Sequence, residues 1–212
     1  MMASARTRIK NAVFDRVPGM VRRGPTAANR VALTFDDGPD HMTGRYLDLL
    51  DDLGVPATFF VIGELAAKDT ASIHDYLRRG HQLGGHGFDH TRFTRLSRRD
   101  LLDQCERTDA AIAGHLPGRP WVRPPHGSIG AASLLTLVAA GYTVAMWSMD
   151  SQDYTIHDAD ALVDRCSPHA ITAGDVVLFH EGQEWTLEAL PRIVTGLQAA
   201  GLECVTMHDL MT

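Results

Sequence analysis

The chain has 212 residues, of which 44% are hydrophobic and 22% are charged, and its formal net charge is −6. This composition is typical of one packed globular domain and excludes a disordered chain. The basic residues are spread over the sequence and do not form the stripe of a nucleic-acid-binding protein, so nucleic acid is not an expected partner. The three cysteines include no CxxC pair and indicate neither a disulfide framework nor a zinc ribbon.

Residues 1–29 are predicted to form a helical extension ahead of the main domain, residues 30–212. Ile9, Val13, Val17 and Met20 recur at helical spacing, which favours a helix that packs against the domain over one that lies on a membrane surface. Charged residues interrupt any apolar run in this segment, so no signal peptide is indicated and the expected location is the cytoplasm. Secretion and membrane association remain alternatives.

Short apolar runs alternate with segments that place apolar residues at helical spacing. The expected strands are 31–35, 57–62, 82–86, 121–123, 143–147, 175–180 and 203–207. The expected helices are 43–54, 70–80, 97–114, 129–141, 157–170 and 184–201. Four of these helices run into a glycine that suits a helix C-terminus, namely Gly54, Gly80, Gly141 and Gly201. The alternation predicts parallel strands in either an open doubly wound sheet or a barrel.

Residues 127–149 carry no charge and are long enough to cross a bilayer. Gly141 divides the segment, with helix-like spacing before it and an alternating, β-prone pattern after it. A buried helix followed by a buried strand is therefore expected, and no transmembrane span.

Polar residues follow five of the expected strands, in the sequences FDDGP, GHGFDH, RPPHG, SMDSQDY and FHEG. Parallel strands place their carboxyl ends at the same edge of a sheet or barrel, which is where functional groups of such folds lie. Carboxylates, imidazoles and a guanidinium are thus expected to converge at one place, and these are groups that carry out hydrolysis.

Two adjacent carboxylates, Asp36 and Asp37, repel each other unless a cation lies nearby. His86 and His90, four residues apart, together with Asp37 would form a three-ligand site with open positions, suited to zinc or a similar divalent ion. Asp36 would then be free to act as a base. The alternative is that the two aspartates only cap the turn that follows them.

The motifs together resemble the polysaccharide deacetylases with a NodB homology domain, carbohydrate esterase family 4. The resemblance covers about residues 30–210. It is carried by TFDDGP at 34–39, HxxxH at 86–90, RxPxG at 123–127, a DxxDW-like segment at 150–154 and LxH at 178–180.

The resemblance implies an α/β fold, a single-domain deformed (β/α) barrel with about seven parallel strands. It implies an enzyme that hydrolyses an acetyl group from an N-acetylated sugar with a divalent metal ion, zinc first, with cobalt, nickel or manganese as alternatives. Carried over to this sequence, Asp37, His86 and His90 would hold the metal. Asp36 would be the general base and His180 the general acid.

The same resemblance assigns roles to residues around these groups. Arg123 would pair with Asp36, Asp153 would orient the catalytic side chains, and the backbone N–H of His126 would stabilise the oxyanion. The acetyl pocket would be walled by Leu178 and by the aromatic Trp147 or Tyr154. A surface ion pair for Arg123 and an ordinary core position for Leu178 are the alternatives.

Gly87, His126 and Tyr154 depart from the family pattern, which usually has Ser or Thr, an aromatic residue, and Trp at these positions. The departures leave the metal and the choice of substrate open. Candidate substrates are a chitooligosaccharide, a peptidoglycan-type glycan, or a glycolipid or precursor glycan. Rival functions are O-acetyl ester hydrolysis on xylan-like glycans, hydrolysis of a small amide, and a catalytically silent carbohydrate-binding protein. The sequence does not indicate an oligomeric state.

Overall fold

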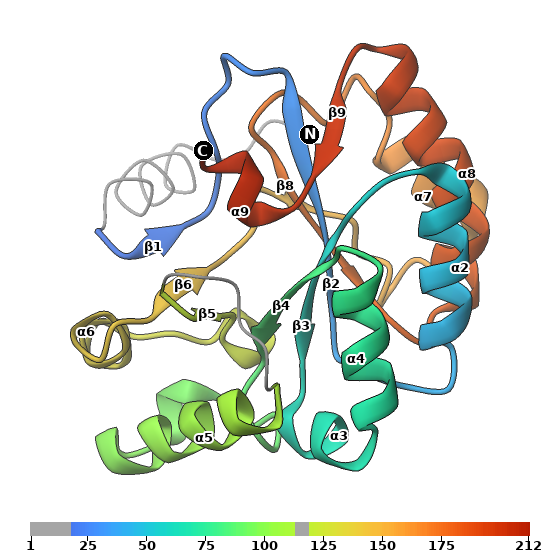
Figure 1. Cartoon of the computed structure of the whole chain (residues 1–212). Coiled ribbons are helices and arrows are strands. Elements are labelled where there is room, and N and C mark those ends of the chain that lie inside the picture. Colours follow the sequence, from blue (N-terminus) through green and yellow to red (C-terminus); the bar gives the residue numbers. More distant parts are fainter. Residues whose placement is uncertain (1–17, 113–118) are drawn as a thin grey trace.

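A curved sheet of parallel strands forms the centre of the molecule, and helices cover its outer face (Figure 1). The computed structural model describes residues 18–112 and 119–212. Within these residues the strand order is β1-β6-β5-β4-β3-β2-β8-β7, and β9 also pairs with β2. The strands are β1 (Met20–Val21), β2 (Arg30–Asp36), β3 (Thr58–Val61), β4 (Gln82–Gly85), β5 (Trp121–Val122), β6 (Thr143–Ala145), β7 (Met149–Asp150), β8 (Val176–His180) and β9 (Glu203–Val205).

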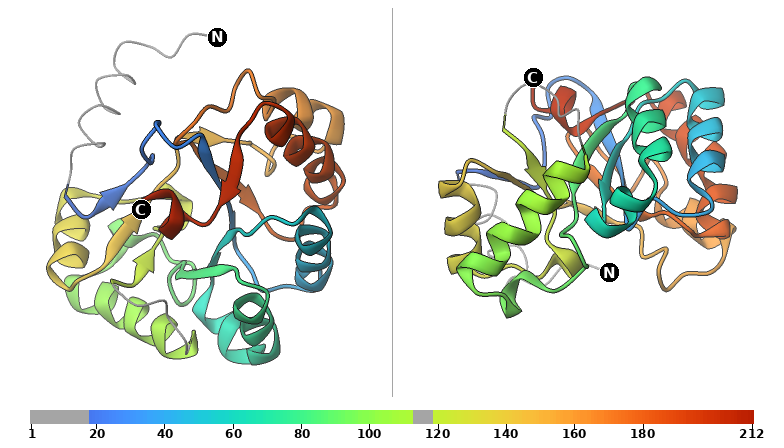
Figure 2. Two further views of the ribbon diagram at one scale, coloured as in Figure 1. Left: turned by 45° about the horizontal axis from the view of Figure 1, so that its top comes forward. Right: turned by 60° about the horizontal axis from the view of Figure 1, so that its bottom comes forward.

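Strand β2 is the centre of the sheet. It pairs with β8 along Ala32–Asp36, with β3 along Thr34–Asp36 and with β9 along Arg30–Ala32, all in parallel. Its residues from Val31 to Asp36 are buried, as expected for a strand covered on both faces. The longer helices lie around the outside of the curved sheet in both views of Figure 2. This is a deformed (β/α) barrel, so the predicted fold class is confirmed.

The helices and the seven expected strands occur where the sequence pattern places them. The helices are α2 (Thr43–Leu53), α3 (Gly63–Lys68), α4 (Thr70–Arg78), α5 (Arg98–Ala111), α6 (Ala131–Ala139), α7 (Ala159–Arg165), α8 (Glu184–Ala199) and α9 (Met207–Leu210), with two 3-10 helices, η1 (Phe93–Arg95) and η2 (Pro125–Gly127). The pattern missed β1, β7, α3 and α9, because elements of two to six residues carry too little periodicity.

The helical extension predicted over residues 1–29 falls largely outside the described residues. From residue 18 onward the chain is described, and there Met20–Val21 forms β1 rather than the end of a helix. This strand pairs in parallel with β6. The uncharged segment 127–149 contains the expected helix and strand, α6 and β6. Within the described ranges, none of the helices has the length and apolar character needed to cross a bilayer.

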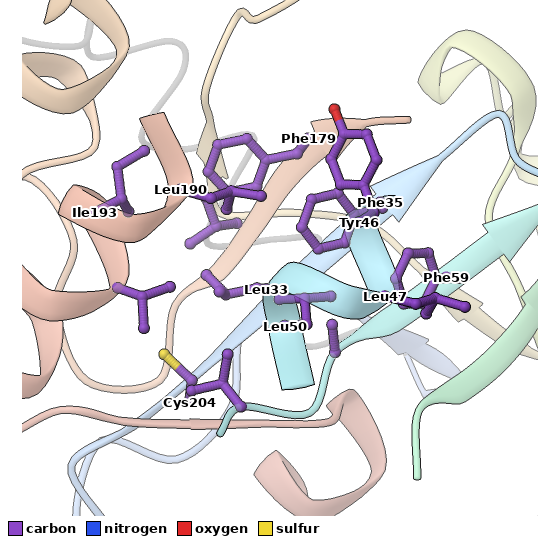
Figure 3. Close-up of a cluster of buried hydrophobic side chains, with 14 of the residues drawn as sticks. Leu33, Phe35, Tyr46, Leu47, Leu50, Phe59, Phe179, Leu190, Ile193 and Cys204 are labelled. Carbon is purple, nitrogen blue, oxygen red and sulfur yellow. The ribbon is translucent and has the colours of Figure 1, made fainter. Parts of the chain in front are cut away.

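The main hydrophobic core lies between the sheet and helices α2, α4 and α8 (Figure 3). Phe35 on β2 is at its centre. The Phe35 ring stacks on Phe59 and Phe179 with centroids 5.1 and 5.6 Å apart, and meets the edge of Tyr46 at 5.6 Å. Aromatic contacts of this kind add to the free energy gained by burial. The core therefore fixes the strands that end at the polar motifs.

Side-chain alternation along β2 and β8 separates the core from the polar residues. Phe35 is the register partner of Phe179, and the next residues, Asp36 and His180, are also partners. The phenylalanines pack against each other in the helix-covered core, while Asp36 and His180 both line a cavity at the carboxyl ends of the strands. The packing of two phenylalanines thus sets the positions of two polar side chains.

We expect Phe35→Ala to lower the free energy of unfolding by about 3–5 kcal/mol, because it opens a cavity among three aromatic rings. Urea unfolding followed by circular dichroism measures the change. Leu135→Ala on α6 is the control, since Leu135 is 70% exposed and its truncation should cost less than about 0.5 kcal/mol. Equal effects of the two substitutions would contradict this account of the core.

Candidate active site

The polar motifs converge at the carboxyl ends of the parallel strands. Asp36 and His180 are the last residues of β2 and β8, and His86 and Arg123 directly follow β4 and β5. A cavity of about 350 Å³ opens there. It is lined by Asp36, Asp37, His86, His90, His126, Gly127, Trp147, Tyr154, Leu178, His180 and Gln183.

Asp37, His86 and His90 form a compact cluster on one side of the cavity. Asp37 Oδ1 lies 3.2 Å from His90 Nε2 and 3.5 Å from His86 Nε2. One ligand atom from each residue lies within 4.8 Å of the others. Asp37 Oδ1 is buried and accepts no hydrogen bond from the described residues. An orphaned carboxylate oxygen facing two imidazole nitrogens is a donor set that fits a divalent metal ion.

The protonation of the cluster suits metal binding as well. His86 Nδ1 lies 2.9 Å from the carbonyl oxygen of Arg123, which can only accept, so Nδ1 carries the proton and Nε2 presents its lone pair to the cluster. Burial lowers the pKa of His86 and so keeps it neutral. Burial raises the pKa of Asp37, but His90 and the charge of His180 outweigh this and lower it to about 2.

Asp36 is held by a buried arginine. Arg123 Nη1 donates to Asp36 Oδ1 at 2.7 Å and to Thr34 Oγ1 at 2.8 Å. Arg123 is 0% and Asp36 2% exposed, so the pair lies in the interior and not on the surface. The predicted contact between the two residues is present. The second oxygen, Asp36 Oδ2, lies 3.7 Å from His86 Nε2 and faces the metal-binding cluster.

His180 is oriented by Asp153, which is fully buried behind it. His180 Nδ1 lies 2.7 Å from Asp153 Oδ1, and Asp153 Oδ2 accepts from the His180 N–H and from Thr186 Oγ1. Burial lowers the pKa of His180, but the hydrogen bond and charge of Asp153 outweigh it and raise the pKa to about 9. At neutral pH His180 is therefore protonated. Its Nδ1–H binds Asp153, so its Nε2–H can donate to a group in the cavity.

The four residues predicted to contact substrate line the cavity, whereas Arg123 and Asp153 lie behind it. The His126 ring packs on His90 with centroids 4.4 Å apart, and Tyr154 meets His180 edge-on at 5.3 Å. Leu178 is 3% exposed and lies at the cavity wall. The predicted set is thus brought together in one place.

Three residues near the cavity were not predicted. Gln183 and Gly127 line it, and a Cβ at Gly127 would come within 2.7 Å of the Trp147 ring. Glu181 is buried beneath it and accepts hydrogen bonds from Tyr76 and Thr43. Burial raises the pKa of Glu181 to about 8. Its position directly after LFH was the only sequence signal, and that position does not predict its burial.

Glu181 supports the turn that carries Asp37. A Cβ on Gly38 would overlap Glu181 Oε2, so only glycine allows the carboxyl group to approach the turn this closely. The turn itself has Asp37 at a φ of 75°, in the left-handed region that non-glycine residues seldom adopt. This conformation directs Asp37 away from Asp36 and toward the histidines.

Comparison with known proteins identifies related sequences. The family model described as "Polysaccharide deacetylase" matches residues 23–145. The peptidoglycan-N-acetylglucosamine deacetylase PgdA of Listeria monocytogenes is 32% identical over 85% of this chain, and the match spans 38% of its own length. The chitooligosaccharide deacetylase of Sinorhizobium fredii is 32% identical over 85% of this chain and 91% of its own length.

Solved structures agree with these matches. The Bc1960 peptidoglycan N-acetylglucosamine deacetylase, in complex with a hydroxamate, has a TM-score of 0.86 and 28% identity over 91% of this chain and 92% of its own. BA3943 of Bacillus anthracis, described as a pseudoenzyme of carbohydrate esterase family 4, has a TM-score of 0.84 and 26% identity over 93% of this chain and 70% of its own. The fold alone therefore does not establish catalysis, which depends on the residues of the site.

We expect Asp153→Asn to lower the pKa of His180 by about one unit or more, because the neutral amide no longer stabilises the imidazolium. NMR titration of the histidine ring protons measures it. Asp150→Asn is the control, since the Asp150 carboxylate accepts from Tyr154 and Gln152 and not from His180. An unchanged His180 pKa in Asp153→Asn would refute the assigned contact.

Proposed function

The chain belongs to the polysaccharide deacetylase family, and on this premise we propose that it hydrolyses the acetyl group from an N-acetylated sugar. One observation carries the proposal. A buried carboxylate, a protonated imidazole and a three-ligand cluster all face a single cavity of about 350 Å³. Amide hydrolysis needs these groups together, because water must lose a proton while the departing amine gains one.

Asp37, His86 and His90 would hold a divalent ion, with zinc as the first choice and cobalt, nickel or manganese as alternatives. When bound, such an ion supplies Lewis-acid chemistry, which polarises an amide carbonyl and makes a water molecule more acidic. The free Asp37 oxygen and the unprotonated Nε2 of His86 support this assignment.

Asp36 is the proposed general base. Its Oδ1 is fixed by Arg123, which leaves Oδ2, on the side of the cluster, to accept a proton from the attacking water. Arg123 does not touch the cavity and is a positioning residue. Because the guanidinium is buried with Asp36, each of the two charges compensates the other.

His180 is the proposed general acid. Its raised pKa keeps a proton on Nε2 at neutral pH, ready for the departing amine nitrogen. Asp153 holds the ring orientation through Nδ1. Asp36 and His180 are register partners on adjacent strands, so base and acid lie side by side at the lining of one cavity. The backbone N–H of His126 remains the proposed donor to the oxyanion.

The cavity walls support an acetyl group as the part of the substrate that enters. Leu178 and Trp147 provide apolar surface, and Tyr154, which is 49% exposed, reaches the rim where a sugar ring would lie. The named relatives act on peptidoglycan N-acetylglucosamine and on chitooligosaccharides, which favours N-acetylglucosamine as the sugar for this chain. Acetate release from chitotetraose and from acetylated xylan distinguishes N-deacetylation from the rival O-deacetylation.

A catalytically silent protein is the alternative that BA3943 illustrates. Two contacts in this chain argue against a silent protein. A binding protein has no need of a buried arginine that fixes Asp36, nor of an aspartate that keeps His180 protonated. Both contacts are costly to bury and act on proton transfer rather than on sugar binding.

We expect chelator to abolish acetate release and zinc to restore it, with one zinc ion bound per chain in calorimetry. His90→Gln should weaken zinc binding by more than about 100-fold, because it removes a direct ligand. His74→Gln, which changes an exposed histidine on α4, is the matched control and should bind zinc normally. Normal zinc affinity in His90→Gln would rule out the assigned cluster.

We expect His180→Gln and Asp36→Asn each to lower acetate release by about 10²–10⁴-fold while zinc binding persists, because each removes one proton-transfer group. Asp36→Asn also leaves Arg123 without its partner, which costs about 3–5 kcal/mol of stability, so its folding is checked by circular dichroism. His180→Gln avoids that problem. Full activity in a folded form of either variant would refute the role assigned to that residue in proton transfer.

A further inference from the structure

Four arginines lie close together in the sequence, from just after His90 into the first turn of helix α5. Arg92, Arg95, Arg98 and Arg99, hereafter the arginine segment, are all exposed. Within residues 18–112 and 119–212, no ion pair or hydrogen bond holds any of their guanidinium groups. Most other arginines of these residues do contact a carboxylate: Arg23, Arg30, Arg45, Arg78, Arg79, Arg107, Arg123 and Arg192. The arginine segment therefore stands out in a chain whose net charge is −6.

The position of the segment is unfavourable for the fold itself. Arg98 and Arg99 are the first two residues of α5, and the only acidic residue in its first turn is Asp100, which is bonded to the N-cap Ser97. Positive side chains at a helix N-terminus oppose the helix dipole. Four neighbouring guanidinium groups also repel one another. A partner outside the protein would remove this conflict.

The arginine segment is anchored to the wall of the active-site cavity. Phe93 of η1 is buried, and its carbonyl accepts from Ser133. Thr94 is hydrogen-bonded to Ser128 at 2.7 Å, directly beside Gly127 of the cavity wall. Helices α5 and α6 contact each other at this corner of the molecule (Figure 1).

The arginine segment begins two residues after His90, which itself lines the cavity. The opposite wall is different, because there the Tyr154 hydroxyl donates to the carboxylate of Asp150 at 3.2 Å. Arg92 and Arg95 thus place positive charge beside His90, whereas Arg165, near the Tyr154 wall, donates to the carbonyl oxygen of Asp150.

We propose that Arg92 and Arg95 bind an anionic group of the substrate glycan, a carboxylate or a phosphate, on the His90–His126 side of the cavity. The proposal rests on the proposed function and adds a substrate class to it. Guanidinium groups recognise both anions with paired N–H donors. Arg98 and Arg99 extend the same positive surface along α5. Binding of an anionic group at this wall would also fix the direction in which the glycan lies across the site.

The test compares kcat/KM for acetate release from three tetrasaccharides. Chitotetraose is neutral, an alternating N-acetylglucosamine and N-acetylmuramic acid tetrasaccharide carries carboxylates, and chitotetraose 1-phosphate carries a phosphate. Arg92→Gln with Arg95→Gln should lower kcat/KM about tenfold for an anionic substrate and leave chitotetraose within about twofold. Which anionic substrate responds distinguishes carboxylate from phosphate.

Arg78→Gln with Arg192→Gln is the matched control, because it removes the same charge from exposed arginines on α4 and α8. It should leave all three substrates unaffected. Raising the salt from about 0.05 M to about 0.5 M should remove most of the preference for anionic substrates in the unaltered protein.

Equal loss on neutral and anionic substrates, or equal loss in the control, would overturn the inference and leave the proposed function standing. A second result would also overturn the inference: Arg92→Gln with Arg95→Gln leaves the kinetics unchanged but no longer sediments with phosphatidylglycerol vesicles. That result would assign the arginine segment to a membrane surface instead. Failure of the unaltered chain to release acetate from any substrate would instead refute the proposed function.

Discussion

The ion pair between Arg123 and Asp36 is the interaction on which the interior of the barrel depends. Arg123 touches four parts of the fold at once: Asp36 and Thr34 on β2, the Met146 carbonyl after β6, the Met207 sulfur on α9 and the Phe60 ring on β3. A guanidinium without a carboxylate at this depth would be an uncompensated buried charge, so the two residues require each other. The pair fills the centre of the barrel. The same contacts fix Asp36, the proposed base, at the rim of the barrel.

This pair also explains how two neighbouring aspartates are tolerated. Asp36 faces inward and pairs with the Arg123 guanidinium. Asp37 has a positive φ, and its side chain points instead to the imidazoles of His86 and His90. The two carboxylates therefore have separate partners, and their repulsion is offset on both sides. One group can act as a metal ligand and the other as a base although they are adjacent in the chain.

The sequence was sufficient to predict the seven main strands, the long helices and the residues that meet at the cavity, because alternating βα units bring all strand ends to one edge. The contacts of Arg123 and Asp153 were also expected, through the family resemblance. The sequence could not indicate that Asp37, His90 and His126 adopt positive φ, since none is glycine and only tertiary contacts impose that conformation. Nor could it assign Glu181, because its burial arises from a close approach to Gly38, distant in sequence.

The cavity concentrates features that weaken a fold. Arg123 Nε and Asp37 Oδ1 are buried without hydrogen bonds, and three site residues have strained backbone angles. The compensation comes from the adjacent core, because Phe35 and Phe179 immediately precede Asp36 and His180 on paired strands. The site and the core are therefore two faces of the same strands. A looser aromatic core would let the strained site relax, so the packing behind the barrel maintains the geometry of the groups that face substrate.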